Sequence, residues 1–445
     1  MRVIQKLMYA FILLAISTLI GVGIVKAEGT PSPLQVLINE AHVGDTLHIP
    51  AGTYKGPIVI DKPLQLVAES GAGATISNTS NEPALQIKAN NVSIIGLTIL
   101  DETIKKQPAI LVQANDVLLD DLQIRTGSFG IIMRKANNGK VLNTTIDWAG
   151  VVQDRPLKLS DKGNGIDLYD SHGNYFAGNT ISSMHDGIYM ENSDRNLIED
   201  NQFELLRYGV HCMYTKGTVI RNNIGNLNIT GAMIMAVRDV EVSGNQFTKQ
   251  SENVNSQGIL LFDAHHTIIS GNHVEGNRVG LYVEQSTKNK IVDNAVIGNF
   301  IGIQLLDAED NDIQENQFVG NVASAEARNS IGNLLESNYW DSFQGIDTDG
   351  DGKSETTYAI NPFFQSLVKA RPAFQLFFQS PGMVFLEDLY QSDRQSWSTD
   401  TSPLMQPSGK LKFVLPTQTL QNSAVVGAGL LIVALYFMYL GVRKR

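Results

Sequence analysis

Two ladders of residues repeat along the middle of the chain at the same spacing. A glycine followed by an apolar residue recurs at intervals of 22, 22, 22, 27, 22 and 22 residues, at Gly165, Gly187, Gly209, Gly231, Gly258, Gly280 and Gly302. An asparagine ladder has identical intervals, at Asn179, Asn201, Asn223, Asn245, Asn272, Asn294 and Asn316. Because both ladders share one insertion, near residues 249–257, each period is one structural unit and the insertion is a loop that projects from it. Asp121 and Asn143 continue the spacing upstream, and about 14 additional residues are expected within 147–165.

Each period consists of short alternating runs of apolar and polar residues, separated by Gly, Asn, Asp and Ser turns. This pattern predicts short strands, because helical spacing is absent. A period of 22 residues is too short for a pair of helices, and the recurrent leucines of a leucine-rich repeat are missing. We therefore predict an all-β fold, a right-handed parallel β-helix over residues 28–362, with strands of successive coils about 4.8 Å apart. The asparagines are then turn residues whose amides hydrogen-bond from coil to coil.

Alternation within each strand assigns the side chains to two faces. Counted from the ladder glycine, positions +1 and +3 are apolar and are predicted to point inward. Cys212 lies in this inward row, where we expect a small buried hydrophobic residue rather than a ligand. Positions +2 and +4 then point outward. Position +2 holds Asp167, Tyr189, His211, Met233, Leu260, Tyr282 and Gln304, and position +4 holds Tyr169, Glu191, Met213, Met235, Phe262, Glu284 and Leu306.

Two adjacent coils present an imidazole and three thioethers side by side toward solvent. His211 and Met213 lie on one coil, and Met233 and Met235 lie on the next. A methionine has no packing reason to face outward, and one nitrogen with several thioether sulfurs suits Cu(I), a soft cation, far better than zinc or magnesium. We therefore expect a copper site here. The alternative is an exposed apolar patch that the C-terminal segment or a partner protein covers.

Further histidines and a methionine lie near these coils. Met184 and His185, just before the Gly187 coil, add copper ligands if their turn folds toward the same face, and are ordinary turn residues otherwise. Three histidines beyond the insertion lie in turn-like stretches and are expected on the surface: His265, His266 and His273.

The acidic segment near the end of the repeat has the opening of an EF-hand-like calcium loop. Asp347, Asp349 and Asp351 occupy positions 1, 3 and 5, and a glycine follows at position 6. Position 12 is Tyr358 instead of the usual glutamate, and Glu355 at position 9 is a candidate substitute. The alternative is a hydrogen-bonded Asp/Gly turn that closes the last coil, where the nearby tryptophan at position 340 is expected to cap the apolar end.

Composition excludes several classes of protein. The 445-residue chain is 43% hydrophobic and 18% charged, which is too apolar for a disordered protein. A single cysteine excludes a disulfide framework, a four-thiolate iron-sulfur cluster and a cysteine-rich zinc module. The formal net charge of -11, without a Lys/Arg cluster in the body of the chain, argues against nucleic acid as a partner.

Both ends of the chain carry membrane signals. Arg2 and Lys6 precede an apolar run at 7–25, and Ala27 ends a flank of small residues, so residues 1–27 read as a signal peptide cleaved after Ala27 or as an uncleaved anchor. Residues 423–442 carry no charge and precede the basic tail 443–445. This pattern predicts a transmembrane helix with a cytoplasmic tail, a buried core helix being the alternative.

These signals predict how the chain is placed and divided. The body of the protein is expected outside the cytoplasmic membrane, in the periplasm or at the cell surface, and anchored by the C-terminal helix. The repeat is absent from residues 363–422, whose apolar pieces suit a segment that docks on a membrane permease or on the β-helix, followed by a linker.

The chain resembles the NosD-type maturation proteins of nitrous oxide reductase over roughly residues 30–390. The resemblance rests on Arg207-Tyr208-Gly209-Val210-His211-Cys212-Met213-Tyr214, the outward methionine pair of the next coil, Asn338-Tyr339-Trp340-Asp341, the acidic segment 347–352, Tyr358, and the stretch from Pro372-Ala373-Phe374 to Ser380-Pro381-Gly382. The C-terminal membrane helix is a departure from many members of that family.

This resemblance implies an accessory protein without catalysis of its own. Such a protein works outside the cytoplasm with an ABC transporter, made of an ATPase and a permease, and with a copper chaperone. Together they assemble the copper sites of nitrous oxide reductase. Carried over to this sequence, the resemblance makes four residues candidates for copper handling: His211, Met213, Met233 and Met235.

Glycan chemistry is the competing function, because β-helices often bind glycans along an outward face. A polysaccharide lyase, hydrolase or epimerase would use Asp167, Asp170, Asp186 and Glu191 as acid/base candidates. Against this, the outward rows downstream turn to Met, Leu and Phe, and no Arg or Lys joins the carboxylates there to neutralise a uronate. A purely structural adhesin is a third interpretation.

Overall fold

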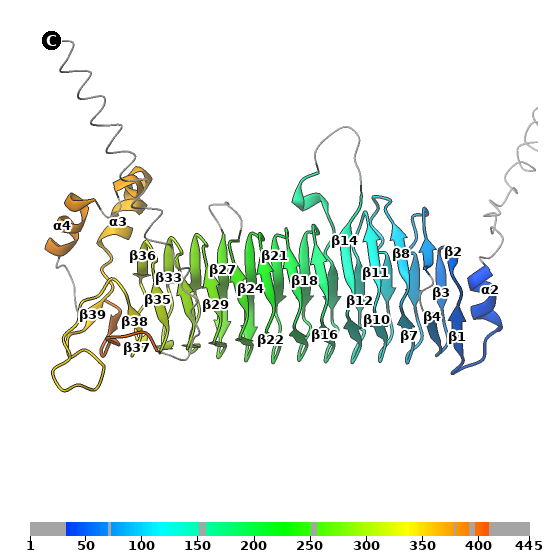
Figure 1. Ribbon diagram of the computed structural model, residues 1–445, viewed down its shortest axis with the longest axis horizontal. Coiled ribbons are helices and arrows are strands. Elements are labelled where there is room, and N and C mark those ends of the chain that lie inside the picture. Colours follow the sequence, from blue (N-terminus) through cyan, green and yellow to red (C-terminus); the bar gives the residue numbers. More distant parts are fainter. Residues whose placement is uncertain are drawn as a thin grey trace, which may run out of the picture.

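The chain winds into an elongated stack of β-coils whose strands form three parallel sheets along the long axis (Figure 1). This computed structural model describes residues 33–69, 73–150, 157–250, 256–377, 380–390 and 397–408. Within them, the three sheets contain 15, 13 and 12 strands, called here sheets A, B and C. The expectation of an all-β, parallel solenoid is therefore confirmed.

Sheet A consists of β1 (Thr46–Ile49), β4 (Gln65–Ala68), β7 (Ser93–Ile95), β10 (Leu118–Asp120), β13 (Lys140–Leu142), β16 (Tyr175–Ala177), β19 (Leu197–Glu199), β22 (Val219–Arg221), β25 (Glu241–Ser243), β28 (Ile268–Ser270), β31 (Lys290–Val292), β34 (Asp312–Gln314), β37 (Leu334–Glu336), β40 (Thr399–Asp400) and β39 (Tyr358–Ala359). Sheet B consists of β2 (Gly52–Lys55), β5 (Ala74–Ser77), β8 (Thr98–Asp101), β11 (Gln123–Thr126), β14 (Thr145–Trp148), β17 (Thr180–Ser182), β20 (Gln202–Glu204), β23 (Ile224–Asn226), β26 (Gln246–Thr248), β29 (His273–Glu275), β32 (Ala295–Ile297), β35 (Gln317–Val319) and β38 (Tyr339–Trp340). Sheet C consists of β3 (Ile58–Ile60), β6 (Leu85–Ile87), β9 (Ile110–Val112), β12 (Ile131–Arg134), β15 (Ile166–Tyr169), β18 (Asp186–Glu191), β21 (Tyr208–Met213), β24 (Thr230–Arg238), β27 (Gln257–His265), β30 (Val279–Glu284), β33 (Ile301–Leu306) and β36 (Ala323–Arg328).

The register of sheet C reproduces the period of the sequence. Ile188 pairs with Val210, and Val210 pairs with Ala232, so equivalent positions of successive coils lie side by side. The inward rows at +1 and +3 are at most 2% exposed from β15 to β33. Cys212 is fully buried in this core, as predicted, and burial raises the pKa of its thiol to about 12. The solenoid therefore has one continuous apolar core along its axis.

The ladder glycines occupy a corner where a side chain has no room. A Cβ on Gly187 would lie 2.3 Å from the carbonyl oxygen of Gly209 and 2.6 Å from the ring of Phe203 in the core. Position 0 and position +1 therefore both face inward, which interrupts the alternation of the strand. As a result, the residue just before each glycine belongs to the outer face of sheet C. This column, called position −1, contains Asp186, Tyr208, Thr230, Gln257, Val279 and Ile301.

The asparagine ladder is a continuous row of buried amides, as predicted. In each coil from Asn179 to Asn316, the side-chain NH₂ donates to the amide oxygen of the next asparagine at 2.9–3.0 Å. The same oxygen also accepts the backbone N–H of the asparagine before it. These hydrogen bonds offset the cost of burying the amides, and they fix the register between coils.

The two ends of the stack are covered. At the N-terminal end, helix α2 (Pro33–Glu40) places the fully buried Leu34 and Ile38 on the first coil. At the other end, Trp340 stacks on Phe318 at 4.2 Å between ring centroids and is 1% exposed, which confirms that it caps the apolar core. The buried carboxylate of Asp400, on β40, accepts hydrogen bonds from the last ladder residue, Asn338, and from Trp340 Nε1 at 3.0 Å.

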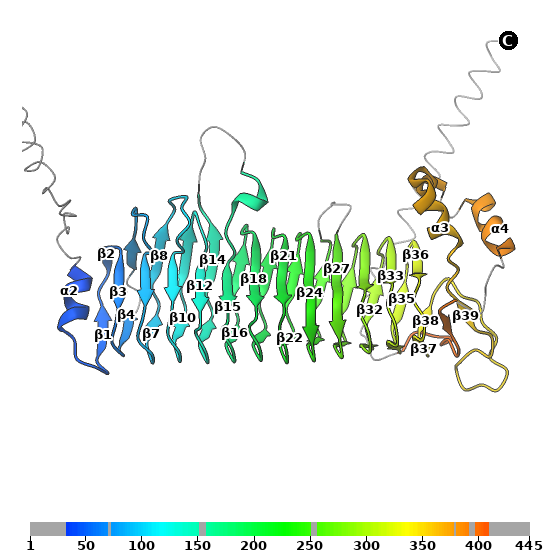
Figure 2. The same cartoon turned by 180° about the vertical axis from the view of Figure 1, so that it is seen from behind.

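The remaining helices lie outside the coils. A short 3₁₀ turn, η1 (Leu159–Asp161), lies in the insertion between β14 and β15, and the second insertion separates β26 from β27, both where the sequence indicated. Helix α3 (Phe363–Ala370), the 3₁₀ helix η2 (Pro372–Phe377) and α4 (Pro381–Leu389) follow β39 at the C-terminal end, as the views from both sides show (Figure 1, Figure 2).

The structure describes neither predicted membrane segment. The signal peptide at 1–27, the helix at 423–442 and the tail at 443–445 lie outside the described residues. Among the residues that are described, none of the helices combines the length and the apolar character needed to cross a bilayer. β40, which follows the helices, returns to the stack and pairs with β37 in parallel and with β39 in antiparallel orientation.

Replacement of Asp400 by alanine tests the end of the ladder. Asp400→Ala leaves the Asn338 and Trp340 donors buried without an acceptor, so we expect the free energy of unfolding to fall by roughly 3 kcal/mol. Denaturant unfolding followed by circular dichroism measures this change. Asp61→Ala, at an exposed position of the N-terminal coils, serves as the control and is expected to change little. Equal stability of the two variants would contradict the role of Asp400.

Candidate functional site

Three neighbouring strands of sheet C bring the predicted copper residues together. On β21 and β24, His211 pairs with Met233 and Met213 pairs with Met235. On the other side of β21, Tyr189 of β18 pairs with His211. Adjacent parallel strands lie about 4.8 Å apart, so the imidazole and the three thioethers form one cluster on the outer face.

The imidazole of His211 is covered by aromatic side chains. Its ring contacts the rings of Tyr189 and Tyr208 edge-on, at centroid distances of 5.0 and 4.8 Å, and the residue is only 6% exposed. The expectation that this side chain faces solvent is therefore wrong, although it does lie on the outer face. Tyr208 stands at position −1, a column that strict alternation assigns to the core.

A buried carboxylate fixes the orientation of His211. Asp186, which is 0% exposed, lies 3.0 Å from His211 Nδ1 and accepts two hydrogen bonds from Arg207, at 2.8 Å from Nε and 2.7 Å from Nη2. Burial alone would raise the pKa of Asp186, but the hydrogen bonds from Arg207 and His211 outweigh it and lower this pKa. The ionised carboxylate therefore accepts the Nδ1–H of His211, which fixes the orientation of the ring.

The second ring nitrogen of His211 is buried and has no partner. Nε2 forms no hydrogen bond with any of the residues that the structure describes. A buried ring nitrogen without a hydrogen-bond partner is costly, and native structures rarely keep one without a reason. A carboxylate that holds one nitrogen of a histidine while the other stays available is the usual arrangement around a metal ligand.

The thioethers are half-buried and within reach of a partner. Met213, Met233 and Met235 are all of intermediate exposure. The Tyr189 hydroxyl donates to Glu191 at 2.9 Å and lies 3.5 Å from the sulfur of Met213. Burial and the neighbouring carboxylate raise the pKa of Tyr189, so this hydroxyl stays protonated. The cluster thus combines one imidazole nitrogen with three thioether sulfurs, a donor set for a soft cation.

Of the two additional ligand candidates, Met184 and His185, only one lies close to the cluster. His185, just before β18, is half-buried, burial lowers its pKa, and its carbonyl oxygen accepts the backbone N–H of Arg207 at 2.7 Å. It therefore lies close to the cluster. Met184 is fully buried in the apolar core, so the structure does not bring it to the outer face. The three histidines predicted on the surface beyond the insertion lie outside the cluster. His265 pairs with Asp263 and Thr287, His273 pairs with Glu275, and the exposed His266 has no side-chain partner among the described residues.

Sequence reasoning missed the supporting groups of His211. Asp186 was considered only as a glycan acid/base residue, and Arg207 and Tyr208 had no predicted role. The signal was present in the period, because Asp186 and Tyr208 are one coil apart and share position −1. It was not recognised because alternation alone places that column inside.

The carboxylates proposed for glycan chemistry are each engaged by a neighbouring side chain. Besides Asp186, Asp167 forms an ion pair with Arg134 at 2.7 Å and accepts a hydrogen bond from Asn164. Asp170 pairs with His172 at 3.1 Å. The remaining candidate, Glu191, accepts the Tyr189 hydroxyl. Glycoside hydrolysis requires one carboxylic acid and one free carboxylate facing the same bond, and these four side chains do not present such a pair.

Three carboxylates of the acidic loop converge. Asp347, Asp349 and Glu355 each place one oxygen within 4.8 Å of the others. Asp351 does not belong to this group. Glu355 reaches back across the loop and accepts hydrogen bonds from the backbone and hydroxyl of Thr348, which lower its pKa. The substitute ligand at position 9 is therefore near the first two carboxylates of the loop.

Comparisons with known proteins identify the family. The family described as "Periplasmic copper-binding protein (NosD)" matches residues 143–352, which include the whole cluster. A protein of Pseudomonas aeruginosa named "Probable ABC transporter binding protein NosD" is 30% identical over 421 residues, covering 87% of this chain and 93% of the relative. The chain belongs to the NosD family. A NosD of Stutzerimonas stutzeri with the same name is 28% identical over 444 residues, covering 88% of this NosD-family chain and 92% of the relative.

Solved structures share the fold of this NosD-family chain. A family 28 exopolygalacturonase of Yersinia enterocolitica superposes with a TM-score of 0.52 at 11% identity, covering 68% of this chain and 74% of that one. A mannuronic acid specific family 6 lyase from human gut microbiota gives 0.50 at 13% identity, covering 69% and 83%. At such low identity the likeness is one of architecture alone.

The buried ion pair beneath His211 predicts a loss of stability when it is broken. Arg207→Gln leaves the Asp186 charge buried with one partner fewer, so we expect the free energy of unfolding at pH 7 to fall by about 3 kcal/mol. Lys216→Gln, which removes an exposed pair with Asp239, is the control and should change it little. Denaturant unfolding of both variants measures the difference.

The same pair predicts a pH dependence. Because the pKa of Asp186 is lowered on folding from its usual 3.8, its stabilising contribution is present above 3.8 and is lost as the pH falls through the folded-state value. The stability difference between the native chain and Asp186→Asn should therefore shrink on acidification below 3.8. A difference that stays constant down to acid unfolding would contradict this assignment.

Proposed function

We propose that this NosD-family chain is an extracytoplasmic copper-binding accessory protein that works with an ABC transporter. Cu(I) binds on the outer face of sheet C to His211 Nε2 and to the thioethers of Met213, Met233 and Met235. The observation that carries the proposal is the buried, unpartnered Nε2 of an imidazole whose other nitrogen is held by Asp186.

The residues fit a soft monovalent ion. Thioethers are poor ligands for magnesium, calcium or zinc, but they suit Cu(I), and a neutral imidazole nitrogen completes such a set. Asp186 holds Nδ1 and so keeps the lone pair on Nε2, and Arg207 keeps Asp186 ionised. Tyr189 and Tyr208 exclude water from the imidazole, while the half-buried methionines leave one side of the site open to a partner.

The donor set suits a metal that is passed on. Three of the four ligands are uncharged sulfurs on flexible side chains, which rearrange easily when a competing ligand approaches. On this proposal copper is cargo: a copper chaperone delivers it, and the ATPase and permease of the transporter couple its use to assembly of the copper sites of nitrous oxide reductase. Support comes from the description of the family as periplasmic and copper-binding, and from relatives named as ABC transporter binding proteins.

The proposed location follows from the same family and from the two ends of the sequence. Residues 1–27 direct export, and the apolar segment 423–442 anchors the chain in the membrane with its basic tail in the cytoplasm. The solenoid then lies outside the cytoplasmic membrane, where the copper sites of the reductase are assembled on this proposal.

Titration with Cu(I) tests the site. We expect the purified chain to bind one Cu(I) in competition with a chromophoric chelator, and His211→Ala or the pair Met233→Ala and Met235→Ala to abolish stoichiometric binding. Asp186→Asn should weaken binding by about 10- to 100-fold, because the ring loses its fixed tautomer. X-ray absorption of the Cu(I)-loaded chain should report both sulfur and nitrogen scatterers.

The matched control is His265→Ala. This histidine lies at the end of β27 on the same sheet and pairs with Asp263 and Thr287, so its removal should leave Cu(I) affinity unchanged. Unaltered binding in His211→Ala, or cleavage of a uronan by the purified chain, would overturn the copper proposal. Cleavage would favour the glycan function in its place.

We propose in addition that the acidic loop binds Ca²⁺ through Asp347, Asp349, Asp351 and Glu355. The convergence of three carboxylates supports this, since hard oxygen donors are what Ca²⁺ prefers. If so, Ca²⁺ at 100 times its dissociation constant raises the free energy of unfolding by about 2.7 kcal/mol. Thermal unfolding with and without Ca²⁺ measures this gain.

Two variants of the loop sharpen the calcium test. Asp349→Asn should remove the gain, whereas Asp351→Asn, outside the convergent group, should reduce it less. Mg²⁺ at the same concentration serves as the ion control, because it tolerates irregular oxygen sites poorly. A melting temperature that does not respond to Ca²⁺ would leave the loop as a hydrogen-bonded turn.

A further inference from the structure

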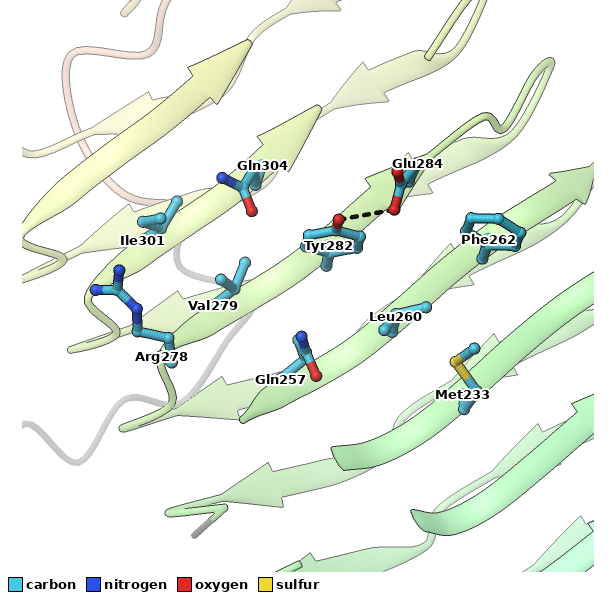
Figure 3. A pocket seen from close by; sticks show the side chains of 10 residues that line it. All are labelled: Met233, Gln257, Leu260, Phe262, Arg278, Val279, Tyr282, Glu284, Ile301 and Gln304. Carbon is cyan, nitrogen blue, oxygen red and sulfur yellow. Dashed lines mark hydrogen bonds between the residues drawn. The ribbon is translucent and has the colours of Figure 1, made fainter. Parts of the chain in front are cut away.

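A pocket of about 320 Å³ lies on the outer face of sheet C next to the copper cluster (Figure 3). It extends over β24, β27, β30 and β33, and its lining combines apolar side chains, chiefly Leu260 and Phe262, with polar ones, chiefly Gln257, Tyr282 and Gln304. Upstream, the outward +2 column of this sheet holds Asp167 and Tyr189 instead. The change from polar to apolar residues makes this part of the outer face a candidate contact surface.

A guanidinium without a carboxylate partner lies at one end of the pocket. Arg278 directly precedes β30 and is half-buried, with its charged group 3.9 Å above the centroid of the Phe300 ring. Among the described residues, no Asp or Glu lies within 4.0 Å of it. The carboxylate whose charge acts on Arg278 is that of Glu326, and it accepts a hydrogen bond from Gln304 at 2.8 Å. A desolvated cation that lacks an ion pair favours an anionic ligand.

The other end of the pocket is acidic. Glu284 ends β30 and accepts a hydrogen bond from the Tyr282 hydroxyl at 2.7 Å (Figure 3). Arg278 and Glu284 are six residues apart on an extended chain, so they lie about 20 Å apart. The pocket is therefore a slot with a cation at one end, a carboxylate at the other, and both apolar and polar side chains between them.

We propose that this slot docks a short extended segment of a partner protein, which places a carboxylate against Arg278 and an apolar side chain over Leu260 and Phe262. An extended peptide matches this lining, because its apolar side chain packs on Leu260 and Phe262 while the side-chain amides of Gln257 and Gln304 can bond its backbone. Met233 lines the slot and also belongs to the copper cluster. A segment docked here lies beside the metal ligands. The partner is then one that exchanges copper, an assignment that rests on the proposed function.

A pair of peptides tests the slot. The probes are fluorescent, C-terminally amidated hexapeptides, Ser-Leu-Phe-Leu-Ser-Asp and its twin ending in Asn, titrated with the full chain by fluorescence anisotropy. The Asp peptide should bind about tenfold more tightly than the Asn peptide. Arg278→Gln should abolish this preference, and Leu260→Ser should weaken both peptides. Arg125→Gln, on β11 of sheet B, is the matched control and should leave both unchanged.

Each remaining outcome decides between interpretations. Equal binding of the two peptides to the native chain, or an Asp preference that persists in Arg278→Gln, would overturn the proposal. Binding of a mannuronate trisaccharide that is tighter than binding of the Asp peptide and that depends on Arg278 would also overturn the proposal, because the slot would then be a glycan site. Far-UV circular dichroism of each variant checks that it folds.

Cu(I) titration of the same proteins separates this proposal from the previous one. Arg278→Gln should bind Cu(I) within about twofold of the native chain, since Arg278 is outside the ligand set. If the native chain prefers the Asp peptide through Arg278 but does not bind Cu(I), the slot is supported and the copper function is refuted. If the chain binds Cu(I) but shows no preference for the Asp peptide, only the slot is refuted.

Discussion

The fixed register between coils is the constraint on which the rest of this molecule depends. From β15 to β38, each strand pairs in parallel with the equivalent strand 22 residues away, or 27 at the second insertion, and the buried amide row holds that alignment from Asn179 to Asn338. In a solenoid each coil contacts only its neighbours, so stability and geometry are both nearest-neighbour properties. A shift of one residue would move every inward side chain to the surface. For the same reason, the register alone decides that His211 stands beside Met233.

Sheet C is where chemistry gathers, and the lengths of its strands explain why. Around the cluster, the strands of sheets A and B contain three residues, whereas β24 and β27 contain nine. A strand of three residues offers one or two outward side chains, while the longer strands offer three columns at positions −1, +2 and +4. Only this sheet can therefore place a ligand, its orienting carboxylate and a covering ring on adjacent strands. The apolar slot around Leu260 continues the same platform.

The period and the faces could be predicted from the sequence because they are local properties. The spacing of the ladders predicted the coil and both insertions, and the alternation of apolar and polar residues predicted the buried row that contains Cys212. Alternation failed at the corners, where the backbone does not remain extended. Ser183, for example, has a φ of 58°, and Met184 after it points into the core. The glycine at position 0 interrupts the alternation in the same way. Strict alternation therefore places Asp186 and Tyr208 in the core, and the burial of His211 beneath Tyr208 could not be predicted.

The C-terminal helices occupy a closed excursion. The chain leaves the stack after β39, forms α3 and α4, and comes back as β40, which pairs with β39 and delivers Asp400 to the end of the amide row. Both roots of this excursion are thus fastened to the same terminal coil. A protein that binds these helices is therefore connected to the terminal coil at two points, through β39 and through β40.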